Sequence, residues 1–188
     1  MKKTGLILFS AAMILSFSAC NNAQDSVDQA ENVNEQKEDQ NSNAVDPKDA
    51  EFAVKATDGG MAEVEISKLA KEKSTNQQVK DFADMMIRDH SAANEKLNAI
   101  TMAKNITVPT SLSSENQDHK NDLAQRSGSD FDKAYMDLME KDHEKTISMF
   151  EDAVNNVKDP ELNNFAKETL PTLRGHLADC KKVQDALK

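Results

Sequence analysis

Four long segments of the chain repeat apolar residues at alternating steps of three and four, which is the spacing of an amphipathic helix. They cover about 47–73, 76–103, 130–157 and 160 onward. The apolar positions of the second segment are Val79, Ala83, Met86, Ala93, Leu97 and Ile100. The fourth segment opens with Asp159-Pro160-Glu161, an N-cap residue followed by proline in the first turn. The pattern predicts an all-α domain built from four long helices.

The connections between these segments differ in length, and this difference indicates the topology. The first and second helices, and the third and fourth, are joined by a few residues, so each pair should be antiparallel neighbours. About two dozen residues separate the second helix from the third, with Pro109 and a short helical stretch near 114–125. We therefore expect residues 47–188 to form a ferritin-like four-helix bundle with one long crossover between helices two and three. A plain up-and-down bundle is the alternative.

The N-terminal segment has the layout of an export signal. A basic start, Met1-Lys2-Lys3, precedes an apolar run over 5–17, and small residues stand directly before Cys20. This arrangement resembles the lipobox of bacterial lipoproteins, although Phe17 stands where that motif usually has Leu. Residues 1–19 are therefore interpreted as a signal peptide, and Cys20 as an acylated mature N-terminus. An ordinary cleaved signal with a coincidental cysteine is the alternative.

The residues after Cys20 predict an acidic tether. Residues 20–46 are dominated by Asn, Gln, Asp, Glu and Ser, so they should bury too little apolar surface to fold and should be disordered. Burial of the acyl chains would make the lipid bilayer a partner of the chain. The expected location is therefore the cell envelope, with the exported protein lipid-anchored at the outer membrane or the periplasmic face.

Composition excludes several classes of protein. Five Gly and four Pro in 188 residues are too few for an all-β fold with many tight turns. The net charge of −10 argues against binding to nucleic acid, whose phosphates require basic patches. With Cys20 lipidated, Cys180 is the only remaining thiol, so no intramolecular disulfide is expected.

Each of the four helices places one metal-binding residue type inside its apolar stripe. These residues are Glu63, His90, His143 and His176, and all lie near the midpoints of their helices. Because midpoints of helices of matched length share one level in a bundle, the four side chains should form one central layer. Three imidazoles and a carboxylate suit Zn, Cu, Fe or Mn. A metal-free polar network that fixes the helix register is the alternative.

A second, softer set of ligands lies one helical turn away. Met86 and Met139 precede a histidine by four residues, and Cys180 follows one by four. Sulfur ligands would suit Cu(I), whereas the alternative is that these side chains only fill the core.

Four short motifs resemble one bacterial family. They are GGMAEV at 59–64, MIRDH at 86–90, FDKAY at 131–135 and LPTLRGHL at 170–177. Together they are similar to the domain of unknown function 4142 family, over roughly residues 50–187. Members of that family are mostly exported and are often named as outer-membrane proteins. The resemblance implies a ferritin-like bundle and supplies no established activity.

Three classes of function follow from these observations. The leading hypothesis is metal binding by a tethered envelope lipoprotein, for storage, buffering or stress protection. A metal-free structural or interaction module of the cell envelope, with protein partners unknown, is the alternative. A metal-dependent redox enzyme is a weaker alternative. Di-iron ferritins need more carboxylates, and Glu140-x-x-His143 is the one match to their E-x-x-H motif.

Overall fold

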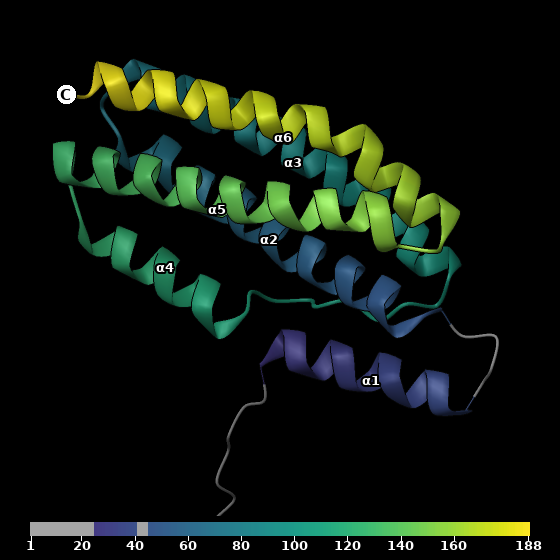
Figure 1. Cartoon of the computed structure of the whole chain (residues 1–188). Coiled ribbons are helices and arrows are strands. Elements are labelled where there is room, and N and C mark those ends of the chain that lie inside the picture. The colour runs from purple at the N-terminus through teal and green to yellow at the C-terminus, as the bar shows by residue number, and fades with distance from the viewer. Residues whose placement is uncertain (1–24, 41–44) are drawn as a thin grey trace, which may run out of the picture.

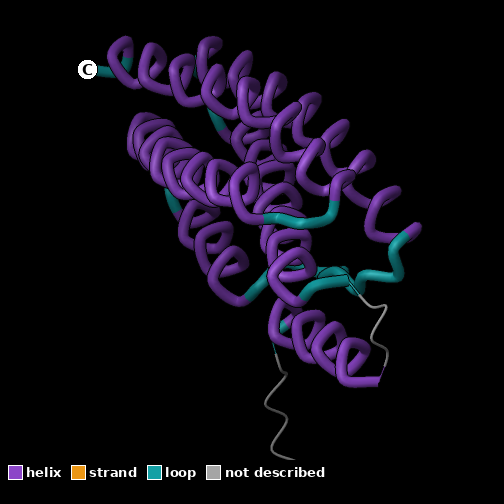
Figure 2. The backbone as a smooth tube through the Cα atoms, turned by 45° about the vertical axis from the view of Figure 1, so that its right-hand side comes forward, coloured by secondary structure: helices purple, strands orange, loops and turns teal. Residues whose placement is uncertain are grey.

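The computed structural model describes residues 25–40 and 45–188, and all regular structure in these ranges is helical (Figures 1 and 2). The helices are α1 (Ser26–Gln40), α2 (Pro47–Lys73), α3 (Gln77–Ala103), α4 (Ser114–Gln125), α5 (Gly128–Asn156) and α6 (Pro160–Ala186). The prediction of an all-α fold is confirmed. Among these described helices, none combines the length and the apolar character needed to cross a bilayer. Residues 1–19, interpreted from the sequence as a signal peptide, and Cys20 lie outside the described residues.

The four long helices pack against one another. α2 lies against α3 and α5 against α6, and contacts of α3 with α6 and of α2 with α5 complete the arrangement. The segment that links α3 to α5 in the chain, residues 104–113 and α4, returns along the length of the bundle. α3 and α5 therefore run in the same direction (Figure 1). Each long helix is therefore antiparallel to the two that it contacts.

Side-chain caps fix where the helices begin. Asn76 Oδ1 accepts hydrogen bonds from the backbone N–H groups of Gln78 and Val79 at the start of α3. Asp159 accepts from Glu161 and Leu162 at the start of α6. Such caps satisfy N–H groups that have no partner inside the helix. They account for the agreement between the predicted and observed starts of these two helices.

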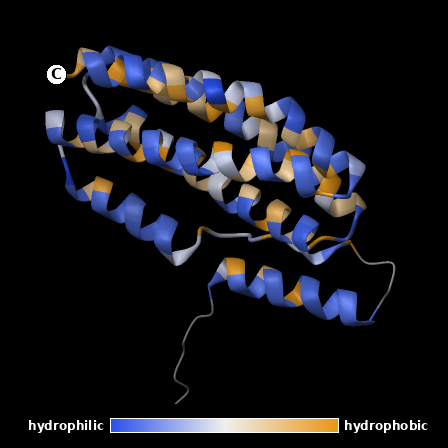
Figure 3. Cartoon of the chain, viewed as in Figure 1, coloured by the Kyte–Doolittle hydropathy of each residue, from blue (hydrophilic) through white to orange (hydrophobic). Residues whose placement is uncertain are grey.

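Two apolar clusters fill the bundle, one toward each end. The first contains Phe52, Phe150 and Phe165, with the rings of Phe52 and Phe150 edge to face at 5.1 Å between centroids. The second contains Tyr135, whose hydroxyl is hydrogen-bonded to Ser67 at 2.9 Å. The helix midpoints lie between the clusters. In contrast to the four long helices, α1 and α4 are mostly hydrophilic (Figure 3).

The prediction of a disordered tether is wrong for residues 26–40, which form α1. This helix docks through polar contacts. The side-chain amide of Asn34 donates to Thr107 O and accepts from Thr107 N, both at 2.8 Å. Lys37 Nζ donates to Asn105 O at 2.6 Å. The hydrophobic pattern missed α1 because Ala30 is the one apolar side chain that the helix buries.

Asn34→Ala is expected to release α1 from the crossover. The substitution leaves the N–H and C=O of Thr107 without their partners, at a cost of about 1–3 kcal/mol for the docked state. A 15-residue helix is only marginally stable alone, so α1 should unfold when it undocks. Amide hydrogen exchange should accelerate across α1 and stay unchanged in α6. Unchanged exchange in α1 would show that these two hydrogen bonds do not hold it.

Replacement by alanine is expected to change the stability of the protein differently at the two adjacent glycines of α2. A Cβ on Gly59 meets no atom within 4 Å, whereas a Cβ on Gly60 would lie 2.1 Å from Asn94 Oδ1 on α3. Gly59→Ala should therefore stabilise the protein by about 0.5–1 kcal/mol through helix propensity. Gly60→Ala should lose that gain, because Asn94 must move. Urea unfolding of both variants tests this pair, and equal stabilisation would contradict it.

Candidate metal centre

Glu63, His90, His143 and His176 come from α2, α3, α5 and α6 and meet at the middle of the bundle. All four are buried, and His143 is fully inaccessible. The imidazole centroids are 5.6 Å apart for His90 and His143, 5.1 Å for His90 and His176, and 5.5 Å for His143 and His176. One ring nitrogen from each histidine lies within 4.8 Å of the others. We call these three residues the histidine cluster.

In each imidazole, one ring nitrogen lies within hydrogen-bond distance of an oxygen atom. His143 Nδ1 donates to the Met139 carbonyl at 2.8 Å. His176 Nε2 lies 3.0 Å from Asp89 Oδ2 and donates to it. His90 Nδ1 lies 2.9 Å from Glu63 Oε2. Such oxygen partners fix ring orientation and tautomer in metal-binding histidines.

The remaining nitrogens have no such partner. His143 Nε2 faces His176 Nδ1 at 3.4 Å. Because the opposite nitrogen of each ring carries the proton, both facing atoms present lone pairs when the rings are neutral. His90 Nε2 is buried without any hydrogen bond. Facing lone pairs and an unsatisfied buried nitrogen are unfavourable alone, and a bound cation would relieve both.

The charges of the layer suit a cation. Burial, the largest influence, lowers the pKa values of His143 and His176, so both favour the neutral form that binds metals. Burial acts against the charged forms of Glu63 and His90 as well, but their mutual attraction outweighs it. That attraction lowers the pKa of Glu63 to about 2 and raises the pKa of His90. Glu63 is therefore a buried carboxylate, and a metal ion could replace the His90 proton as its counter-charge.

Glu63 is placed in the predicted layer, but its contacts differ from those of a fourth ligand. Its Oε2 is taken by His90, and its Oε1 lies 3.4 Å from His143 Nδ1, whose hydrogen is donated to Met139. The ring nitrogens that lie within 4.8 Å of one another belong to the three histidines. The geometry gives Glu63 an orienting and charge-balancing position beside the cluster.

The structure places a further acidic residue beside the layer. Asp89 accepts from His176 and is itself bound by Arg88, with 2.7 Å from Arg88 Nε to Asp89 Oδ1. Sequence spacing alone suggests a supporting or surface position for Asp89, because neighbouring helical residues point about 100° apart. Its contact with a histidine from α6 could not be predicted, since it depends on the relative rotation of two helices.

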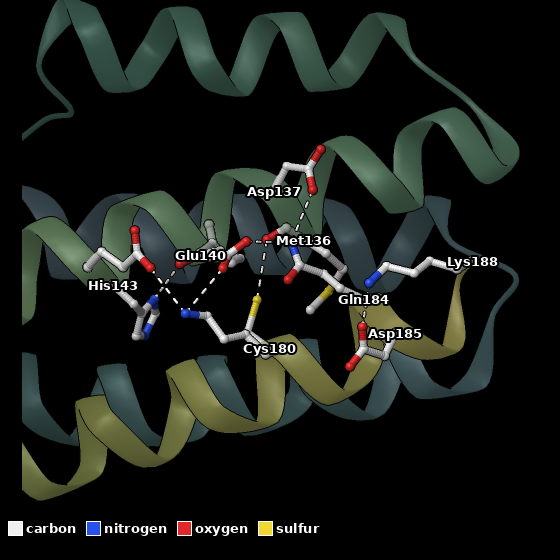
Figure 4. Close-up of polar contacts among 11 residues, drawn as sticks. Met136, Asp137, Glu140, His143, Cys180, Gln184, Asp185 and Lys188 are labelled. Carbon is white, nitrogen blue, oxygen red and sulfur yellow. Dashed lines mark hydrogen bonds and ion pairs between the residues drawn. The ribbon is translucent and has the colours of Figure 1, made fainter.

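Met86, Met139 and Cys180 lie together in the apolar cluster on one side of the layer. The Cys180 thiol donates to the Met136 carbonyl at 3.3 Å (Figure 4). Burial raises the pKa of this thiol to about 12. Since the thiolate is the metal-binding form, these contacts favour a packing role for Cys180.

Solved structures with the same fold come from other proteins. A fragment of a DUF305 protein from Deinococcus radiodurans matches with a TM-score of 0.69 at 14% identity, covering 76% of this chain and 99% of that one. CopM in its Cu(II)-bound form matches with a TM-score of 0.63 at 16% identity, covering 74% and 97%. CopM in its silver-bound form matches with a TM-score of 0.60 at 16% identity, covering 73% and 96%. At such identities the likeness shows the fold alone.

One family match covers most of the chain. No curated protein matches it. The sequence profile of one family, described as a domain of unknown function (DUF4142), matches residues 34–183, which include part of α1 and the complete histidine cluster. The family resemblance carried by the four short motifs is thereby confirmed, and the chain belongs to the DUF4142 family.

Proposed function

We propose that this chain is a metal-binding lipoprotein of the bacterial cell envelope, in which a ferritin-like four-helix bundle holds one transition-metal ion. The proposed ligands are His90, His143 and His176, with Glu63 and Asp89 orienting two of the rings. The single observation that carries this proposal is the 3.4 Å separation of His143 Nε2 and His176 Nδ1. Two nitrogens bound at about 2.0–2.1 Å to a tetrahedral ion lie roughly 3.3–3.4 Å apart.

Copper is the metal that we propose among Zn, Cu, Fe and Mn. Imidazole ligands suit both copper and zinc, and copper binds such sites more tightly in the general affinity order. Structures of the similar protein CopM hold Cu(II) or silver. Met86 and Met139 one turn away would support a reduced, softer ion without being required as ligands.

The burial of the layer favours holding a metal over turning over a substrate. The three histidines are at most 5% exposed, so an organic substrate has no direct access to the bound ion. Storage, buffering or protection against metal stress therefore fits better than catalysis. The acylated Cys20 would keep this metal-binding domain at the envelope surface.

Titration of the full chain with Cu²⁺ tests this function. One equivalent should bind with an electron paramagnetic resonance spectrum that shows coupling to three imidazole nitrogens. A spectrum with oxygen ligands alone would contradict the proposal, since it would place the ion on surface carboxylates. In that case the central layer would be a structural polar network.

A second experiment tests the proposed anchor. Cells that express the chain and grow with a labelled fatty acid should incorporate the label into the protein, and Cys20→Ala should abolish incorporation. A label that persists in Cys20→Ala, or that never appears in the parent, would rule out acylation at this cysteine.

A further inference from the structure

A cavity of about 460 Å³ lies between α1, α2, the start of α4 and α5. α1 and α4 lie along the side of the bundle that α2 and α5 form (Figure 1). The lining is strongly acidic, with the carboxylates of Asp25, Asp28, Asp58, Glu63, Glu115 and Asp142. Its basic residues are Lys55 and Lys145. We call this space the acidic cavity.

Glu63 connects the acidic cavity to the histidine cluster. Its side chain lines the cavity, and it is 3% exposed with an Oε1 atom that has no hydrogen bond. His143 Nδ1 lies 3.4 Å from this oxygen, but its hydrogen is donated to Met139. A second space of about 30 Å³, enough for one or two waters, is lined by both Glu63 and His90. Glu63 therefore lines both spaces, and the smaller one also reaches His90 of the histidine cluster.

Three other carboxylates of the cavity differ in their contacts. Asp25 and Asp58 are occupied, because they accept hydrogen bonds from the backbone N–H groups of Ser114 and Ser113. Asp142 is half-buried and forms no hydrogen bond or ion pair with the described residues. It belongs to the same cavity wall as Glu63.

The two lysines do not neutralise Glu63 or Asp142 by direct contact. Lys55 pairs with Glu51, outside the lining, and Lys145 lies 3.9 Å from Glu115. A buried carboxylate oxygen without a partner and a half-buried free carboxylate thus share one cavity. Burying such groups is costly unless a cation joins them.

We propose that the acidic cavity is a second cation site, in which Asp142 and the free oxygen of Glu63 hold a hydrated divalent metal ion before it reaches the histidines. The destination rests on the proposed function, whereas the cavity site stands on its own contacts. Carboxylate oxygens and water are the ligands that hard, hydrated cations prefer. An ion with six waters occupies roughly 180 Å³ at about 30 Å³ per water, which the cavity accommodates.

Mn²⁺ is the probe for this site, because it favours oxygen ligands and its paramagnetic signal reports the bound fraction. The full chain should bind one Mn²⁺ weakly. Asp142→Asn should weaken Mn²⁺ binding at least tenfold, while Asp118→Asn, an exposed residue of α4 outside the cavity, should leave it unchanged. No Mn²⁺ binding by the parent, or equal binding by Asp142→Asn, would overturn the proposal.

Stopped-flow uptake of Cu²⁺ by the same proteins tests the route to the histidines. Asp142→Asn should slow uptake about tenfold without changing the final amount bound, since Asp142 is outside the histidine cluster. Uptake as fast as in Asp118→Asn would show that the ion reaches the histidines another way. If Mn²⁺ binds as expected but the parent takes up no Cu²⁺ at its histidines, the proposed function fails and the cavity site remains.

Discussion

Replacing His143 with glutamine is expected to weaken metal binding in the central layer by more than about 100-fold. Loss of a residue that merely orients a ligand already costs about 10–100-fold in affinity, and His143 is proposed as a ligand itself. His143 also supplies one of the two nitrogens that face each other at 3.4 Å. Glutamine keeps a side-chain N–H that can still donate to the Met139 carbonyl, so the bundle should remain folded. Competition with a chelator of known affinity measures the effect.

The matched control for this experiment is His119→Gln. His119 lies on α4, outside the histidine cluster, so this variant should bind metal like the parent. Circular dichroism should show the same helix content in all three proteins. Equal affinity in His143→Gln and the parent would remove His143 from the ligand set.

Glu63→Gln is expected to destabilise the metal-free protein by about 3–5 kcal/mol. Removal of one partner from a buried ion pair leaves the other charge uncompensated, and both Glu63 and His90 are buried here. His90 must then lose its proton or remain charged without a counter-ion. Urea unfolding of the metal-free full chain gives the difference in the free energy of unfolding.

Glu65→Gln provides the comparison on the same helix. Glu65 is more than a third exposed and pairs with Lys68 and Lys120 at the surface. Exposed pairs of this kind contribute about 0–1 kcal/mol, so this variant should unfold almost like the parent. If Glu63→Gln and Glu65→Gln lower the free energy of unfolding by similar amounts, the buried pair stabilises the protein no more than the exposed pairs do.

The long helices and the histidine cluster could be predicted from the sequence, because several local sequence features indicate the same helices. The apolar spacing, the cap residues Asn76 and Asp159 and the short connections all favour the same elements. The central layer followed from placing polar residues at the midpoints of four helices of similar length. That inference needs no knowledge of how each helix is rotated.

What could not be predicted depends on contacts between distant residues. α1 is held by hydrogen bonds from Asn34 and Lys37 to the crossover, which no hydrophobic pattern reveals. The contact of Asp89 with His176 joins α3 to α6 and depends on their mutual rotation. α1 forms one wall of the acidic cavity. Because the sequence predicted a disordered tether in place of α1, it could not predict the cavity.

Elemental analysis of the full chain, purified without a histidine tag, tests the proposed metal site most directly when it is run beside the His90→Ala/His143→Ala variant. Close to one transition-metal ion per parent chain is expected, with copper preferred when Zn, Cu, Fe and Mn are supplied together. The variant should lose this metal while it keeps its helix content. If the parent carries no metal after growth with all four elements, and none of them raises its melting temperature, the histidine cluster is not a metal site.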